Sequence, residues 1–155
     1  MTDILKDNIK HFFVVTICFI LDRLTKFFVI ENNIENMAIS DYLNINLIWN
    51  TGIGFGLLRL EPNITYHLFS AFIFCIILFV IIIGLKEQNL NRYGYALIVG
   101  GAIGNLYDRI TLFAVPDFID FHYKNFHWFT FNIADIFVTI GILILIVLEI
   151  SKVRK

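Results

Sequence analysis

The stretch Phe131-Asn132-Ile133-Ala134-Asp135 stands at the start of the last apolar segment of the chain, and the rest of the sequence is interpreted from it. Residues 136–150 are almost wholly apolar, which predicts a membrane-spanning helix. A carboxylate in such a helix costs roughly 2.5 to 3.5 kcal/mol on insertion scales, so Asp135 is a candidate functional residue. Asn132 and Asp135 are three positions apart and share one face of a helix.

The composition is that of an integral membrane protein. Hydrophobic residues make up 58% of the chain, whereas soluble domains contain about 45–50%. The length of 155 residues predicts a single domain, residues 1–155. The net charge of −1 gives no indication of nucleic-acid binding. The cysteines and histidines show no ligand spacing, so we expect no metal site.

Four segments are apolar and long enough to cross a membrane as helices. The segment 64–85 is the clearest because it contains no charge. The third segment contains Gly100, Gly101 and Gly104, and small residues at such spacing let helices pack closely in lipid. We expect spans at about residues 11–30, 64–85, 93–110 and 132–150.

The positive charges predict the orientation of these spans. Lysine and arginine cluster at both termini and in the short turn 86–92, and the positive-inside rule makes that side cytoplasmic. Both termini are therefore expected inside, with the two larger loops and the polar clusters at the outer face. The cations concerned are Lys6, Lys10, Lys86, Arg92, Lys152, Arg154 and Lys155.

The two larger loops differ in pattern. The region 31–63 is too polar to span, and residues 43–47 alternate between aliphatic side chains and asparagine, which predicts a half-buried strand. Glycines at positions 52, 54 and 56 then indicate a bent strand or a loop with close backbone approach. The stretch 111–130 is rich in aromatic side chains, so we expect a mixed loop at the membrane interface.

Carboxylates and carboxamides gather near the outer ends of the last two spans. Two carboxylates held close together share one proton, so that one can act as general base for water and the other as general acid. Asp135 is one candidate, but spacing alone does not choose between Asp117 and Asp120 for the other. Arg109 is placed either to order a lipid head group or to pair with Asp108.

The first span carries a further polar pair. Asp22 and Lys26 are one helical turn apart. They form either a structural ion pair near the interface, with Lys26 extending toward water, or a part of the polar site that Asp22 faces.

Three other functions fit parts of this pattern. Clustered aspartate and asparagine oxygens suit Mg²⁺, as in a metal-dependent lipid phosphotransferase or phosphatase. Carboxylates could carry protons in a small dimeric transporter, although the polar groups cluster at one face rather than at mid-membrane. The third alternative is a scaffold in which the polar residues only hold helices together.

Taken together, the motifs resemble the lipoprotein signal peptidases, the type II signal peptidases of bacteria. The resemblance covers nearly all of the chain and depends on the order of the motifs. They are Asp22 with Thr25-Lys26, Asn50-Thr51-Gly52 followed by Phe55, Gly100-Gly101-Ala102 leading to Gly104-Asn105 and Asp108-Arg109, Asp117-Phe118, and Phe131-Asn132 with Ala134-Asp135.

The resemblance implies a fold and an activity. The fold is an all-α membrane protein, a four-transmembrane-helix bundle with a small extracytoplasmic β-cradle, here at about residues 31–63. The activity is aspartic proteolysis, without metal or cofactor, of prolipoproteins that already carry diacylglycerol on a cysteine, cut just before that cysteine. The location is the bacterial cytoplasmic (inner) membrane. We expect a monomer whose partners are these substrates and membrane lipid.

The resemblance also implies the site residues. Asp117 and Asp135 match the catalytic aspartates. Pro116, Gly54 and Gly56 depart from the family's usual pattern and bear on loop geometry and substrate preference. The residues that match positions lining the substrate site are Asp22, Lys26, Asn50, Gly52, Asn105, Arg109 and Asn132.

Overall fold

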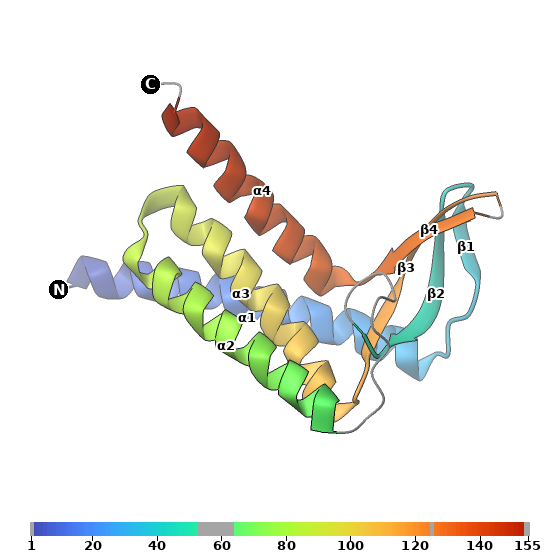
Figure 1. The fold of residues 1–155 in the computed structure, drawn as a ribbon. Helices are drawn as coiled ribbons and strands as arrows, with labels where there is room; N and C mark the ends of the chain where they lie inside the picture. The colour runs from blue at the N-terminus through green and yellow to red at the C-terminus, as the bar shows by residue number, and fades with distance from the viewer. Residues whose placement is uncertain (1, 53–63, 125, 154–155) are drawn as a thin grey trace.

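The computed structural model describes residues 2–52, 64–124 and 126–153, with side chains from residue 8 onward. This part of the chain is mostly helical and contains a small antiparallel sheet (Figure 1). Gly54 and Gly56, whose effect on the loop was considered above, lie outside the described residues. The elements are α1 (Thr2–Glu31), β1 (Met37–Ser40), β2 (Leu43–Asn50), α2 (Ile64–Lys86), α3 (Asn89–Thr111), β3 (Val115–Tyr123), β4 (Phe126–Phe131) and α4 (Ile133–Val153).

Two of the described helices, α2 and α4, are long and apolar enough to cross a membrane. They coincide with the spans expected at 64–85 and 132–150. The segments expected at 11–30 and 93–110 are helical as well, within α1 and α3. These two helices are more polar because they carry the charged residues that meet between them.

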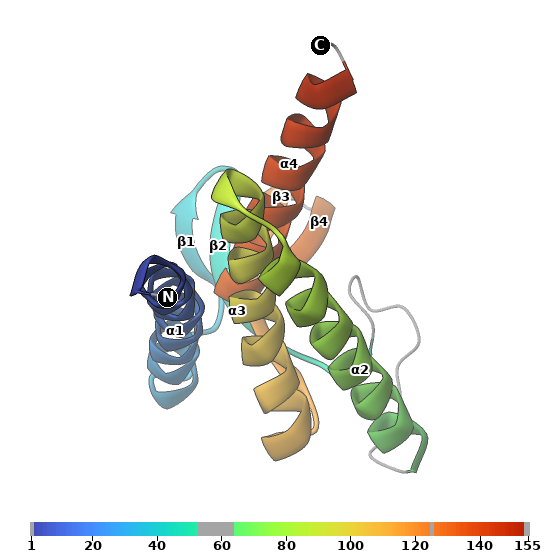
Figure 2. The ribbon, with the colours of Figure 1, turned by 90° about the vertical axis from the view of Figure 1, so that its left-hand side faces the viewer.

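Helix α3 is the centre of the helical part. It packs against α1, α2 and α4, and Figure 2 shows it between α1 and α2. Its small residues permit these contacts. A Cβ added at Gly100 would lie 2.6 Å from the Cβ of Cys18 in α1, and one added at Gly101 would collide with the carbonyl of Ala134 in α4. The glycine spacing in the sequence therefore predicted close helix packing correctly.

The sheet corrects one expectation. Its strand order is β1-β2-β3-β4, with every neighbouring pair antiparallel. The strand expected near residues 43–47 is present in β2, but the region 111–130, expected to be a loop, supplies β3 and most of β4. The aromatic side chains there were interpreted as interfacial anchors, whereas aromatic residues also favour strands. The pairing of β3 with β2 joins segments about seventy residues apart. Such a distant pairing produces no pattern that can be recognised within either segment of the sequence.

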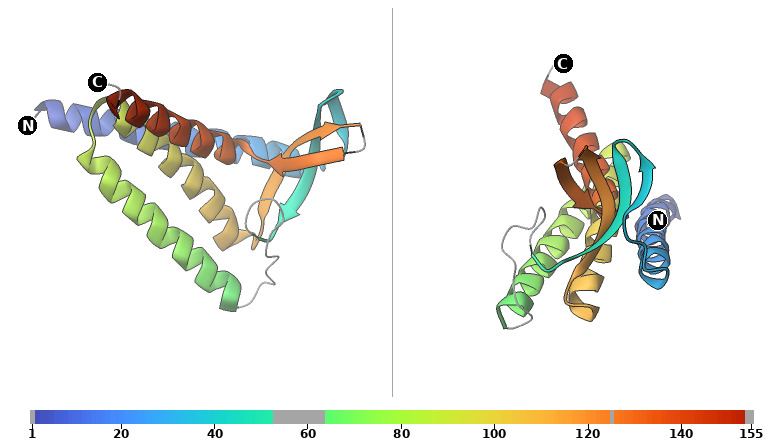
Figure 3. Two further views of the ribbon diagram at one scale, coloured as in Figure 1. Left: turned by 45° about the horizontal axis from the view of Figure 1, so that its top comes forward. Right: turned by 90° about the vertical axis from the view of Figure 1, so that its right-hand side faces the viewer.

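The sheet lies at one end of the helical part (Figure 1). The amino terminus, the α2–α3 connection and the carboxyl terminus lie at the other end, as the left view of Figure 3 also shows. Asn132, between β4 and α4, is therefore at the junction of sheet and helices, and Asp135 lies in the first turn of the last helix.

Candidate active site

Asp135 is fixed by a reciprocal cap at the start of α4. Asn132 stands directly before the helix, and its Oδ1 accepts a hydrogen bond from the backbone N–H of Asp135 at 3.1 Å. The backbone N–H of Asn132 in turn donates to Oδ2 of Asp135, also at 3.1 Å. This is the arrangement of a capping box, in which the first and fourth residues satisfy each other's exposed N–H groups. The Asn-x-x-Asp spacing thus sets the position of this carboxylate.

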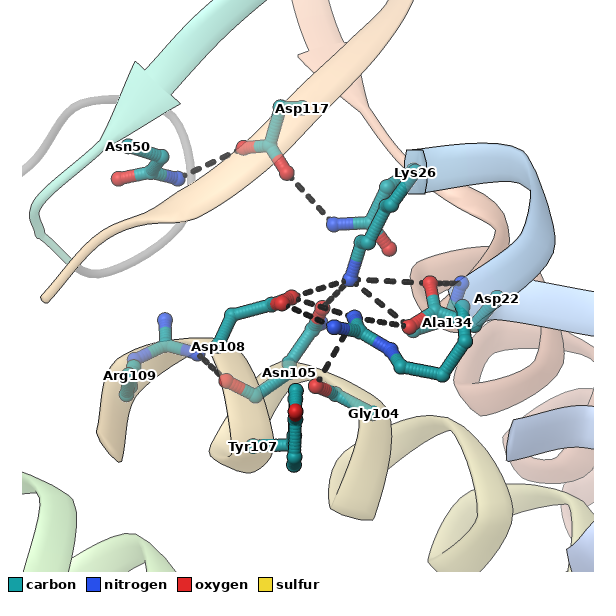
Figure 4. A network of polar contacts seen from close by, with 12 residues as sticks. Asp22, Lys26, Asn50, Gly104, Asn105, Tyr107, Asp108, Arg109, Asp117 and Ala134 are labelled. Atoms are coloured by element: carbon teal, nitrogen blue, oxygen red, sulfur yellow. Dashed lines mark hydrogen bonds and ion pairs between the residues drawn. The ribbon is translucent and has the colours of Figure 1, made fainter. Parts of the chain in front are cut away.

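Asp117 lies on β3 and is held by two carboxamides. Nδ2 of Asn132 donates to Oδ1 of Asp117 at 2.6 Å, and Nδ2 of Asn50, from the end of β2, donates to Oδ2 at 2.8 Å (Figure 4). Asn132, which is fully buried, therefore contacts both carboxylates that the sequence singled out. Residues from a strand and a helix start are brought together through this one side chain.

Asn105 of α3 completes the contacts of Asp135. Its Nδ2 donates to Oδ1 of Asp135 at 2.8 Å. Its Oδ1 accepts a hydrogen bond from Nζ of Lys26 at 2.8 Å. Asp135 thus accepts one hydrogen bond on each carboxylate oxygen, from Asn105 and from the backbone of Asn132.

The environment of Asp117 makes it a weaker acid than usual. Burial raises its pKa from 3.8 to about 6, and the negative charge of Asp135 acts in the same direction. The hydrogen bonds from Asn50 and Asn132 and the positive charge of Lys26 act in the opposite direction. Asp117 can therefore carry a proton at a pH where an ordinary aspartate is ionised.

Both carboxylates line one small cavity of about 160 Å³. Two larger cavities lie elsewhere in the described part of the chain and are lined mainly by apolar side chains, without either aspartate. Chemistry rather than size therefore identifies the candidate site. Its lining residues are Asn50, Asn105, Arg109, Val115, Asp117, Phe129, Thr130, Phe131 and Asp135.

Arg109, which lines the cavity, links α3 to Gly52 just after β2. Arg109 donates from Nη2 to the carbonyl of Gly52 and from Nη1 to the carbonyl of Asn105, each at 3.2 Å. The N–H of Gly52 donates to Oδ1 of Asn50 at 3.0 Å, which orients the amide that holds Asp117. The pairing of Arg109 with Asp108, considered above, is wrong, because Asp108 pairs with Arg23 and Lys26 of α1 instead.

Asp22 and Lys26 lie behind the cavity rather than on its wall. They form the ion pair that their spacing predicted, at 2.9 Å, but Lys26 is only 1% exposed, so its extension toward water is wrong. Lys26 donates to Asn105 and Asp108 of α3, and Asp22 accepts from the N–H of Ala134 at the start of α4. Arg23 contacts both Asp22 and Asp108. Sequence reasoning missed Arg23, although a guanidinium inside a mostly apolar segment was a signal.

Asp120 is separated from the site. Residues three apart on a strand point to opposite faces of the sheet, so Asp117 and Asp120 diverge. Asp120 is 1% exposed, and its Oδ2 lies 2.6 Å from Nδ1 of His127 on β4. Of the two aspartates that spacing left open, Asp117 is the one that meets Asp135.

The comparisons with known proteins all indicate the same family. The family model described as signal peptidase (SPase) II matches residues 14–151. A lipoprotein signal peptidase of Pelagibacter ubique is 45% identical to this chain, covering 94% of it and 92% of the relative. A lipoprotein signal peptidase of Dichelobacter nodosus is 33% identical, covering 91% and 94%.

Two solved structures share the fold. Both are of bacterial membrane enzymes studied by the in meso method. One gives a TM-score of 0.79 at 25% identity, and the match covers 93% of this chain and 89% of the chain in that structure. The other gives 0.74 at 26% identity and covers 90% and 92%. With the family model matching most of its length, the chain belongs to the signal peptidase II family.

Proposed function

We propose that this protein is an aspartic endopeptidase that removes the signal peptide from diacylglyceryl-modified prolipoproteins by cleaving before the lipidated cysteine. The observation that carries the proposal is that Asp117 and Asp135 line one cavity and are both held by Asn132, which donates to Asp117 from its side chain and to Asp135 from its backbone N–H. The names of the relatives supply the substrate class.

The proposed mechanism uses the two carboxylates as one unit. One aspartate takes a proton from water, which attacks the scissile carbonyl. The other donates its proton to the carbonyl oxygen. The first aspartate then passes the proton taken from water to the leaving amine, and the second regains its proton as the C–N bond breaks and the carbonyl re-forms. The raised pKa of Asp117 supports a pair that holds one proton near neutral pH. Asn50, Asn132 and Asn105 keep the carboxylates in place during these transfers.

The remaining site residues are assigned by their contacts. Arg109, which lines the cavity, and Gly52, whose carbonyl accepts a hydrogen bond from it, are proposed to contact the substrate backbone. Asp22 and Lys26 are proposed to act from behind the cavity. We propose no metal and no cofactor for this reaction, since a carboxylate pair activates water by itself.

The proposed architecture is a single domain of four membrane-crossing helices, with the sheet as an extracytoplasmic cradle. Large apolar side chains are exposed along α1, α2 and α4, which supports contact with lipid acyl chains. Lys10, Lys86, Arg92 and Lys152 all belong to the end of the molecule away from the sheet, which supports a cytoplasmic location for both termini (Figure 3). We further propose an inner-membrane monomer.

This orientation can be tested by labelling with a membrane-impermeant maleimide, in a background with Cys18 and Cys75 replaced by alanine. Lys124, at the turn between β3 and β4, and Ser151, near the end of α4, are exposed positions for new cysteines. We expect Lys124→Cys to be labelled from outside intact cells and Ser151→Cys only after lysis. The opposite pattern would place the cavity on the cytoplasmic side and contradict the proposed topology.

The proposed activity can be tested by incubating the purified protein with a diacylglyceryl-modified prolipoprotein, with and without EDTA. We expect cleavage at the same rate in both samples, because the proposed pair needs no cation. An activity that EDTA abolishes and Mg²⁺ or Zn²⁺ restores would instead indicate a metal-dependent site. Absence of cleavage in both samples would contradict the proposed function.

A further inference from the structure

Four charged side chains meet between α1 and α3: Asp22, Arg23, Lys26 and Asp108, here called the charge quartet. Asp22 and Asp108 are fully buried, Lys26 is 1% exposed and the side chain of Arg23 is 21% exposed. Nη2 of Arg23 lies 2.7 Å from Asp22 and 2.8 Å from Asp108. Nζ of Lys26 lies 2.9 Å from Asp22 and 2.6 Å from Asp108. The quartet has two charges of each sign.

Stability alone is a poor reason for such a cluster. Removing charges from water costs several kcal/mol per ion, and well-packed apolar side chains often replace buried ion pairs without loss. The quartet also requires α1 and α3 to pack closely at a glycine, because a Cβ added at Gly104 would lie 2.5 Å from Oδ2 of Asp22. A functional reason requires a contact of the quartet that an apolar replacement could not make.

Lys26 makes that contact. Its ammonium group donates to Asp22, to Asp108 and to Oδ1 of Asn105 (Figure 4). An ammonium group can only donate hydrogen bonds. It is therefore compatible with just one orientation of the Asn105 amide, the one with the oxygen toward Lys26. The Nδ2 group must then point the other way, where it donates to Oδ1 of Asp135.

A second contact joins the quartet to the start of α4, the helix that carries Asp135. Oδ1 of Asp22 accepts a hydrogen bond from the backbone N–H of Ala134 at 3.1 Å. Ala134 directly precedes Asp135 in the first turn of α4. The quartet therefore reaches Asp135 both through the Asn105 amide and through the backbone next to it.

We infer that Lys26 is a positioning residue for Asp135: it fixes the Asn105 amide in the orientation that donates to this carboxylate, and Asp22, one turn earlier on α1, holds Lys26 in place. The inference rests on the proposed function, in which Asp135 is catalytic, and it assigns to Lys26 a role other than contact with substrate. Arg23 and Asp108 form the other pair of opposite charges in the quartet, and we assign them no positioning role.

The positive charge of Lys26 also acts on Asp117, the second proposed catalytic aspartate. Three charged residues act electrostatically on Asp117 from the helices: Asp135 from α4, Arg109 from α3 and Lys26 from α1. Strand β2 contributes the neutral Asn50, which donates to it. Lys26 lowers the pKa of Asp117, so its removal should raise that pKa further. The alkaline limit of activity should then move to higher pH, because the pair keeps its shared proton longer.

Two double variants separate positioning from packing. Asp22→Asn with Lys26→Met removes one charge of each sign and the contact with Asn105, while the new amide at position 22 can still accept a hydrogen bond from the N–H of Ala134. Arg23→Gln with Asp108→Asn also removes one charge of each sign but leaves Lys26 beside Asp22 and Asn105. Thermal unfolding establishes that both variants are folded before they are compared.

Two measurements decide the inference. In the prolipoprotein assay, we expect Asp22→Asn/Lys26→Met to lose kcat by about 100-fold with KM little changed, the scale of a misplaced catalytic group, and Arg23→Gln/Asp108→Asn to stay close to wild type. In carboxyl ¹³C NMR, with the Asp117 signal assigned from Asp117→Asn, the titration midpoint should rise in the first double variant only.

Equal losses of kcat in the two double variants, or a rise in KM with kcat intact, would overturn the positioning role. The NMR titration needs no substrate, so it decides the inference even if the wild-type protein does not cleave prolipoprotein. An Asp117 midpoint that moves equally in both variants, or in neither, would contradict the inference while leaving the proposed function untouched.

Discussion

Replacing Asp117 with asparagine is expected to abolish cleavage of a diacylglyceryl-modified prolipoprotein, and so is replacing Asp135 with asparagine. Asparagine keeps the shape of the side chain, but its amide cannot take up or release a proton as a carboxyl group does. The double variant should be no less active than either single variant, because groups that act as one unit are strongly non-additive. Product formation by the purified variants in detergent or lipid measures all three.

Asp120→Asn is the matched control for this prediction. It makes the same chemical change three residues away on the same strand, but Asp120 faces the other side of the sheet and contacts His127. We expect substantial activity, with some loss of thermal stability because the replaced carboxylate is buried. A near-native rate for Asp117→Asn together with an inactive Asp120→Asn would mean that the first catalytic carboxylate is misassigned.

Removing the carboxamides is expected to give the next largest losses. Asn132→Ala should lower the rate by roughly 10² to 10³, the scale of a lost preorganised donor, because the side chain of Asn132 donates to Asp117 and accepts from the N–H of Asp135. Asn105→Ala should lower it on the same scale by releasing Asp135. Asn132→Ala also removes the cap of α4, which costs about 1 kcal/mol, so unfolding should be measured beside turnover.

Asn32→Ala is a suitable control for both carboxamide variants. Asn32 is exposed at the end of α1, where its Nδ2 donates to the carbonyl of Phe28 away from either aspartate. It should retain wild-type turnover. If Asn132→Ala and Asn105→Ala also turn over at the wild-type rate, these amides serve only to pack the helices and the proposed support of the carboxylates is wrong.

The most local features of the fold could be predicted from sequence. The long, almost wholly apolar segments predicted α2 and α4, because each is long enough by itself to cross a membrane. The three-residue spacing of Asn132 and Asp135 placed them on one face, and the structure adds the reciprocal cap that this spacing allows. Both conclusions depend on residues within one or two helical turns.

Features that depend on distant partners could not be predicted. The strands β3 and β4 were missed because β3 is completed by pairing with β2, far away in the chain. The partners of Asp108 were missed because they lie on α1, more than eighty positions earlier. The preference for Asp117 over Asp120 came from family resemblance, since both residues have the same charge and the strand that separates their faces was not recognised.

The most direct test of the central claim is mass spectrometry of the products formed in H₂¹⁸O by the wild-type protein and by Asp117→Asn/Asp135→Asn. We predict that the wild type releases a signal peptide ending immediately before the lipidated cysteine, with ¹⁸O from water in its new carboxyl group, and that the double variant releases none. Cleavage by the double variant at the wild-type rate would contradict the claim that this carboxylate pair performs the reaction.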